Sequence, residues 1–256
     1  MAYVLDGFRL WFRHFLLFTG LTLTVWLPGN ILMILAEQSA STSGSLLVPA
    51  LLQLLINPFL AIAILYATHQ LYHGRTATFL ATVSFAFRKW VAMFLTDFTA
   101  SIFIGLGFLI LVIPGLVMII RYALIGPVVA FEGRTGVAAI QRSSEIVRNC
   151  WAPVLAVNLA AATVGMVLMF AVYAALDTLY FSLAISDQAY MVLDVVANCL
   201  ADVIVAPLTI ILYFIYVDQV GIETEDSPEE DGNDDDHNVI SFAKDDGNPY
   251  GSPLTE

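Results

Sequence analysis

Five polar side chains inside apolar stretches are the first residues of this sequence that could do chemistry: Arg121, Asp97, Asp194, Asn198 and Asp202. The last three follow one another at intervals of four residues, which places them along one face of a helix. Two carboxylates and an amide in such a row can bind a cation or relay protons. The alternative is a structural row that packs against other polar side chains, such as Asn158 or Asn57.

Arg121 is a fixed positive charge in an apolar surrounding, and it needs a partner. An unpaired charge at the centre of a membrane helix costs about 2.5 to 3.5 kcal/mol. Counted along their helices, Arg121 and Asp97 lie roughly 15 Å and 9 Å from the same end, within reach of a long arginine side chain. We therefore expect Arg121 to pair with Asp97, or with Glu132 by bending toward the interface. The pair would hold a hairpin together, or the arginine could share an anionic lipid or substrate group.

Enzyme and metal motifs are missing from the sequence. His69 and His73 stand four residues apart, but the stretch HQLYH lacks the glutamate of the zinc-protease motif. There is no glycine-rich phosphate loop before a soluble helix, no nucleophile elbow and no cluster of metal-ligand residue types. We therefore expect no catalytic residue, no metal, no cofactor and no enzyme activity.

Membrane helices are the elements that must position these residues. Hydrophobic residues make up 59% of the 256 residues and charged residues 12%, about half of the roughly 25% found in soluble domains. Six apolar stretches approach or exceed the length of about 20 residues that crosses a bilayer. They cover residues 15–36, 46–68, 91–112, 116–131, 152–176 and 190–217. The third and fourth belong to one run, in which Pro114-Gly115 is the strong helix breaker, so we expect a hairpin there.

The basic residues test this layout. Nine of the ten Lys and Arg lie outside the six stretches, in segments that share one side of the membrane: Arg9, Arg13, Arg75, Arg88, Lys89, Arg134, Arg142, Arg148 and Lys244. The loops on the other side, 37–45 and 177–189, contain no Lys or Arg. The positive-inside rule then places both termini in the cytoplasm. The first stretch is too long for the apolar part of a signal peptide, so we expect it to remain as the first helix.

Amphipathic basic segments precede the odd-numbered helices. GFRLWFRHFLLF at 7–18, SFAFRKWVAMFL at 84–95 and SEIVRNCWAPVLAV at 144–157 each pass through Arg and Trp into a span. This pattern predicts an all-α integral membrane protein of three hairpins, each preceded by a cytoplasmic amphipathic helix at the headgroup level. Arg148 and Trp151 would anchor the third such helix, or they would form part of a lipid headgroup site.

The last segment of the chain differs in composition from the rest. Residues 222–256 hold 12 of the 22 acidic residues and one Lys. We expect a six-helix transmembrane domain over residues 1–221 and a disordered acidic cytoplasmic tail over residues 222–256. The tail is a solubilising extension, or it docks a basic protein partner through the stretch NVISFAK. Nucleic acid is not an expected partner for this charge balance.

A short motif in the middle of the chain resembles a known family. Its pieces are IPG at 113–115 with Pro114 and Gly115, then Arg121, Pro127, Glu132-Gly133, Arg142-Ser143 with Arg148 in the basic stretch after it, and LYFIYVDQ at 212–219. They resemble bacterial six-helix membrane proteins related to the membrane domain fused to some glycerophosphodiester phosphodiesterases and to YciC-like proteins. The resemblance implies the six-helix architecture. This chain lacks the phosphodiesterase domain, and its tail is acidic where that family has a basic or mixed end, so the catalytic activity is not carried over.

Two functions fit these observations. We expect a non-enzymatic multi-pass protein of the bacterial cytoplasmic membrane that organises membrane lipids or a protein partner at the cytoplasmic face. The alternative is a small transporter or channel for an ion-coupled or anionic substrate, in which proline-broken helices surround a polar site. One water-filled cavity shared by Asp97, Arg121 and Asp202 would favour transport, whereas separate packed positions would favour the non-transporting protein.

Overall fold

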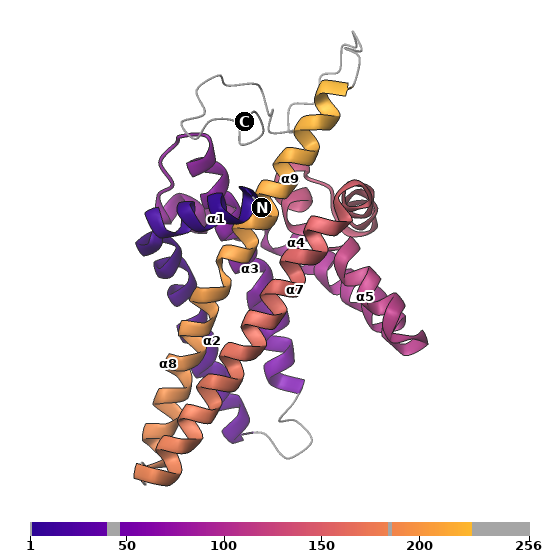
Figure 1. Cartoon of the computed structure of the whole chain (residues 1–256). Coiled ribbons are helices and arrows are strands. Elements are labelled where there is room, and N and C mark those ends of the chain that lie inside the picture. The colour runs from indigo at the N-terminus through magenta and orange to yellow at the C-terminus, as the bar shows by residue number, and fades with distance from the viewer. Residues whose placement is uncertain (1, 40–46, 184–185, 227–256) are drawn as a thin grey trace.

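The computed structural model is all-helical, and it describes residues 2–39, 47–183 and 186–226 (Figure 1). Six helical stretches are long and apolar enough to cross a membrane: Phe15–Met33, Leu51–Tyr72, Phe79–Ile110, Val112–Glu132, Gly136–Ser182 and Gln188–Gly221. By helix length and hydropathy, the chain is a multi-pass membrane protein. The prediction of an all-α protein with six apolar spans is confirmed.

The N-terminal part consists of a short helix and a hairpin. Helix α1 (Ala2–Arg13) is followed by α2 (Phe15–Ser39) and α3 (Leu47–Tyr72), which pack against each other. Helix α1 is amphipathic, because Leu10 and Trp11 are buried while several neighbours on its other face are exposed. It also packs against the last helix of the chain, so the two ends of the described sequence lie together.

The second hairpin joins α4 (Phe79–Ile110) to α5 (Val112–Arg121). The turn is at Leu111, whose backbone is extended (φ −164°, ψ 152°), and not at Pro114-Gly115 as expected. Proline is tolerated in the first turn of a helix, where its missing N–H would have no intrahelical acceptor, so Pro114 lies in the first turn of α5 without breaking it. In Figure 1 this hairpin leans away from the other spans.

Gly115 has a packing role within this hairpin. A Cβ atom at Gly115 would lie 2.6 Å from a ring carbon of Phe108, and one at Gly107 would lie 3.1 Å from the Gly115 backbone. Small residues allow membrane helices to approach closely, because no side chain holds the backbones apart. The pair of glycines therefore fixes how tightly α4 and α5 cross.

The returning span is interrupted after α5. A turn over residues 122–124 leads into α6 (Ile125–Pro127), which continues as the π-helix η1 (Val128–Glu132). Most side chains of η1 are buried, and Gly133 ends it with φ +69°, a value that other residues rarely adopt. The predicted fourth span, 116–131, is therefore three helical pieces rather than one helix.

The third hairpin begins with α7 (Gly136–Leu183), which bends at Cys150 (φ −129°, ψ 31°). Pro153 has no N–H for the carbonyl of Asn149 and its ring crowds that carbonyl, which explains a bend at this point. The first part of α7 is seen end-on in Figure 1, and the second part descends as a span. The surface helix and the span that the sequence pattern separated are thus one bent helix.

The last predicted span, 190–217, is divided into α8 (Asp187–Val205) and α9 (Pro207–Asp226). The break falls at Ala206, directly before Pro207, which begins the new helix at a position where proline fits. Helix α9 continues past the predicted domain boundary at residue 221 to Asp226. The rest of the predicted acidic tail, residues 227–256, lies outside the described residues.

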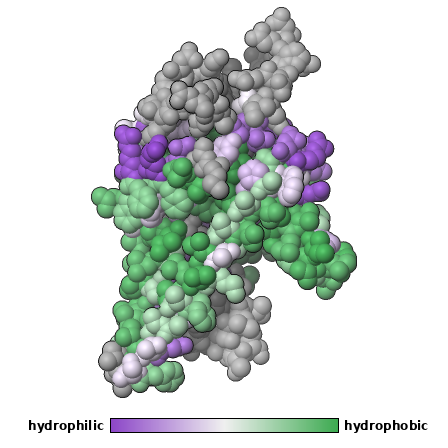
Figure 2. Space-filling view, viewed as in Figure 1, coloured by the Kyte–Doolittle hydropathy of each residue, from purple (hydrophilic) through white to green (hydrophobic). Residues whose placement is uncertain are grey.

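Polar and apolar surfaces are separated along the molecule. Hydrophilic side chains form a band across the end at which α1 and the first part of α7 lie, and hydrophobic side chains cover most of the spans beyond it (Figure 2). We call this end the polar end. Apolar side chains on the spans, such as Leu109 and Phe170, are strongly exposed, as expected of surfaces that face lipid. The largest buried side chains include Phe131, Tyr213 and Tyr216, all close to the polar end.

Candidate functional site

Glu132, at the end of η1, is the centre of a cluster at the polar end. Its carboxylate accepts hydrogen bonds from Arg142 Nε of α7 at 3.1 and 3.2 Å and from the Tyr216 hydroxyl of α9 at 3.0 Å. Arg134 Nε lies 3.3 Å from the same carboxylate. We call these four residues the Glu132 cluster. It ties three elements together, and its central carboxylate is 13% exposed, so the loss of one partner would leave a poorly solvated charge.

Ser143 joins α7 to the turn after α5. Its buried hydroxyl donates a hydrogen bond to the Arg121 carbonyl at 2.8 Å and accepts one from the Leu124 N–H at 3.2 Å. These backbone groups lie where α5 ends, and helix ends leave such groups without intrahelical partners. The serine therefore holds the end of α5 against α7.

A hydrogen bond from α4 holds the loop between η1 and α7. The Gly136 N–H donates to Thr96 Oγ1 at 2.8 Å, and Gly136 itself has φ +59°. The loop therefore ends at Gly136, which is anchored to α4, and it begins at Gly133, where the positive φ turns the chain. This places Arg134 beside Glu132 and starts α7 at a defined position.

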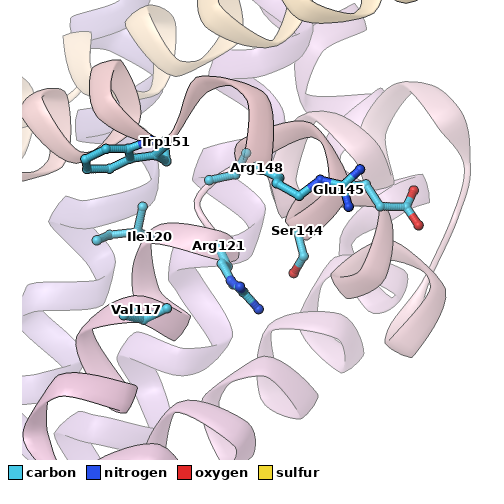
Figure 3. Close-up of a pocket in the computed structure, with 8 residues that line it drawn as sticks. Val117, Ile120, Arg121, Ser144, Glu145, Arg148 and Trp151 are labelled. Atoms are coloured by element: carbon cyan, nitrogen blue, oxygen red, sulfur yellow. The ribbon is translucent and has the colours of Figure 1, made fainter.

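A cleft of about 460 Å³ lies beside the cluster, between the last turns of α5 and the first part of α7 (Figure 3). We call it the arginine cleft. Arg121 and Arg148 supply its positive charge, and Val117, Ile120 and Trp151 form much of its apolar wall. In Figure 3 the Ser144 hydroxyl points from α7 toward the side on which the Arg121 guanidinium lies. Basic groups, an apolar wall and an exposed tryptophan are typical of the headgroup level of a membrane protein.

The two arginines of the cleft have free hydrogen-bonding capacity. Neither Arg121 nor Arg148 forms an ion pair with another described residue. Glu145, also on the cleft, lies 4.0 Å from Arg142 of the Glu132 cluster. A guanidinium presents a planar fork of donors that matches phosphate or carboxylate oxygens. Two such groups facing one cleft can hold an anion.

The expected ion pair of Arg121 with Asp97 or Glu132 is not formed. Arg134 and Arg142 are the arginines that pair with Glu132, and Asp97 lines a different cavity. The expectation assumed a helix that continues to residue 131, with Arg121 near its middle. The helix instead ends at Arg121, where the dipole of α5 favours a cation without an acidic partner.

The row on α8 bonds partly within its own helix, and its Asp194 also has a hydrogen bond with Tyr173 of α7. The Asn198 amide donates to the backbone carbonyl of Asp194 at 2.9 Å and to its carboxylate at 3.0 Å. Asp202 lies in the last turn of α8, and its carboxylate makes no hydrogen bond with another described residue. Asn158, one of the two partners considered for a structural row, bonds to the carbonyl of Val154 on its own helix, at 2.8 Å.

The predicted intramembrane residues Arg121, Asp97 and Asp202 do not line a common cavity. Arg121 lines the arginine cleft, Asp97 lines a cavity of about 260 Å³ between α3 and the second hairpin, and Asp202 lines neither of them. The arrangement therefore has two separate charged sites of opposite sign.

Aromatic and histidine side chains complete the polar end, and sequence reasoning did not find this role. His69 Nδ1 and the Tyr213 hydroxyl are 2.7 Å apart, and the His69 ring stacks on Phe131. The Tyr3 hydroxyl donates to Asp218 at 2.6 Å, which attaches α1 to α9. A signal was present, because PFLAIAILYATHQ and PLTIILYFIYVDQ match at equal spacing and place His69 and Asp218 at equivalent positions. Among the described residues, no group of three or more His, Cys, Asp or Glu is arranged to hold a metal ion.

The residues of the sequence motif occupy connected positions in the structure. They form the second hairpin and its return (Pro114, Gly115, Pro127), the Glu132 cluster and its loop (Glu132, Gly133, Arg142), and the frame of the arginine cleft (Arg121, Ser143, Arg148). In comparisons with protein-family models, curated proteins and solved structures, nothing matches this chain.

Proposed function

We propose that this chain is a non-enzymatic protein of the bacterial cytoplasmic membrane that binds and organises anionic lipid at the cytoplasmic face. The observation that carries the proposal is the arginine cleft, in which Arg121 and Arg148 face one space and neither is paired with an acid among the described residues. Both termini and the polar end would then lie on the cytoplasmic side.

The chemistry of the cleft fits a phospholipid. The guanidinium groups of Arg121 and Arg148 would take the phosphate oxygens, each contact near a membrane surface contributing about 1 kcal/mol. Val117 and Ile120 offer an apolar wall for the first part of an acyl chain. Trp151, 59% exposed, would lie at the headgroup level, where its ring contacts both lipid and water.

The orientation rests on where the basic residues lie. Arg9 and Arg13 belong to α1, Arg75 to the loop before α4, and Arg134 to the loop before α7, all at the polar end. A basic face of this kind is retained in the cytoplasm during insertion and attracts the anionic lipids of the inner leaflet.

We also propose that the resemblance to the six-helix membrane domain reflects this function, because the motif residues that carry the resemblance build the frame of the cleft. Ser143 holds the end of α5, which carries Arg121, against α7, which carries Arg148. Lipid binding is preferred to transport because a transport path requires its charged groups around one cavity, whereas Arg121 and Asp97 line different ones.

Titration of the purified full-length protein with phosphatidylglycerol, followed by native mass spectrometry, tests the proposal. Phosphatidylcholine serves as the neutral lipid. We expect preferential binding of phosphatidylglycerol and a loss of about tenfold in affinity for each of Arg121→Gln and Arg148→Gln, which corresponds to about 1.4 kcal/mol. The control is Arg88→Gln, which removes an exposed charge outside the cleft and should change the affinity less than threefold.

Equal binding of the two lipids by the unmodified protein would contradict the proposal. So would an unchanged affinity for phosphatidylglycerol in the double variant Arg121→Gln, Arg148→Gln. Helix content by circular dichroism must be the same in all variants, so that a loss of binding reports on the cleft and not on the fold.

A further inference from the structure

The cavity that contains Asp97 is a second candidate site, separate from the arginine cleft. Its volume is about 260 Å³. Asp97 and Ser101 reach it from one face of α4, Asn57 from α3, and Tyr122 from the turn after α5. None of these four side chains makes a hydrogen bond or an ion pair with another described residue. An embedded carboxylate without a partner is costly in a membrane, which indicates that something else meets it.

The backbone of α3 beside this cavity has a carbonyl without its usual intrahelical donor. Pro58 has no N–H, so it cannot donate to the carbonyl of Leu54 one turn earlier. Both residues line the cavity. The Asp97 carboxylate and the Ser101 hydroxyl also accept hydrogen bonds, so the residues that line the cavity offer several acceptors. Among the described residues that line it, Asp97 is the only charged one, so the site matches one positive charge.

The size and the rest of the wall favour an organic cation over a metal ion. The volume is several times the share of about 30 Å³ that one water molecule occupies in the liquid. Ile104, Ile119 and Ile125 form an apolar part of the wall, which would contact the hydration water of a metal ion unfavourably but suits a hydrocarbon group. Ser101 and Ile119 are exposed on the spans, so the cavity opens toward the lipid.

We infer that Asp97 is the counter-ion of a binding site for an amphiphilic primary amine, which enters from the bilayer. The ammonium group donates hydrogen bonds to the Asp97 carboxylate and to the acceptors beside it, and the apolar body lies against the isoleucines. The site goes beyond the proposed lipid function, because it uses a different cavity and binds the opposite charge.

Retention of tritiated dodecylamine by the full-length protein in phosphatidylcholine nanodiscs tests this inference, with empty nanodiscs as the baseline. We expect saturable binding of one molecule per chain. Asp97→Asn should weaken it at least tenfold, and Ile104→Trp, which fills the cavity and keeps the carboxylate, should weaken it as well. Asp202→Asn is the matched control, since Asp202 is another aspartate in a span and does not line this cavity; it should change the affinity less than twofold.

Three results would overturn the inference. They are binding by Asp97→Asn equal to that of the unmodified protein, equal competition by uncharged dodecanol, and displacement of the amine by sodium or potassium chloride at the same concentration, which would indicate an inorganic cation site. Phosphatidylglycerol binding should be unchanged in Asp97→Asn, so failure here and failure of the proposed lipid function are distinguishable.

Discussion

Arg142 and Arg121 lie at the same end of the molecule and have opposite surroundings. The Arg142 side chain is 18% exposed, and its Nε bonds to both oxygens of Glu132. Arg121 is exposed at the end of α5 and has no ion pair with a described residue. The contrast separates a charge that is used to hold the fold from a charge that is available to a ligand.

The elements that face each arginine explain why Arg142, and not Arg121, pairs with Glu132, and position along the predicted helices does not. Glu132 ends the π-helix η1 and faces α7 and α9, so Arg142 reaches it from a neighbouring helix while Arg121 does not. Arg121 lies at the C-terminus of α5, where the helix dipole favours a cation. Whether each of these two arginines pairs with Glu132 therefore depends on which elements face that carboxylate.

The largest effect is expected from removing the charge of Glu132. Glu132→Gln keeps the shape of the side chain but removes the anionic partner closest to Arg142, at a cost of about 3 kcal/mol. We expect a clearly lower melting temperature of the purified protein in detergent. The control is Glu145→Gln, since the Glu145 side chain is 60% exposed and its change should cost less than about 0.5 kcal/mol. Equal melting temperatures for the two variants would remove the structural role given to Arg142.

A smaller effect is expected at Ser143, which connects the Glu132 cluster with the arginine cleft. Ser143→Ala leaves the Arg121 carbonyl and the Leu124 N–H without the serine hydroxyl, at a cost of about 1 to 3 kcal/mol. Because the end of α5 is then held less firmly, affinity for phosphatidylglycerol should fall together with the melting temperature. The neighbouring variant Ser144→Ala should leave the melting temperature nearly unchanged. A Ser143→Ala variant with full stability and full lipid affinity would show that this serine positions nothing.

The smallest effect is expected at the contact between α1 and α9. Burial, together with the hydrogen bond to Asp218, raises the pKa of Tyr3 to about 12. Since the unfolded value is about 10, the folded state holds the phenol proton more tightly, so this stabilisation is complete below pH 10 and is lost as the pH rises toward 12. Tyr3→Phe should cost about 1 kcal/mol at neutral pH. Melting temperatures at pH 9 and pH 11.5 should decrease more in the unmodified protein than in Tyr3→Phe, and parallel decreases would exclude this role.

Much of the fold is predictable from local sequence because its cause is local. An apolar run of sufficient length has to cross the membrane as a helix, since its backbone groups can find partners there only within the helix. The long apolar run over residues 91–131 has to fold back because a single helix of that length would be longer than the membrane is thick. The place of the turn was not predictable, because Leu111 carries no breaker signal, whereas Pro114 does and is absorbed into the first turn of α5.

The candidate sites were also predictable only in part from the sequence. Residue types alone predicted candidate positions at Arg121, at Asp97 and in the motif around Glu132 and Arg142. Their pairing was not predictable, because it depends on which helix faces which.

The sequence by itself thus determined that the helices lie in lipid, how many spans there are and which chemical groups lie within them. These properties follow from hydropathy, length and residue type. The tertiary structure alone decided that Glu132 pairs with Arg142, that Ser143 bridges the end of α5, and that Arg121 and Asp97 line separate cavities. The physical reason is that hydropathy acts on each segment separately, whereas a hydrogen bond or an ion pair requires two segments to meet within about 3 to 4 Å.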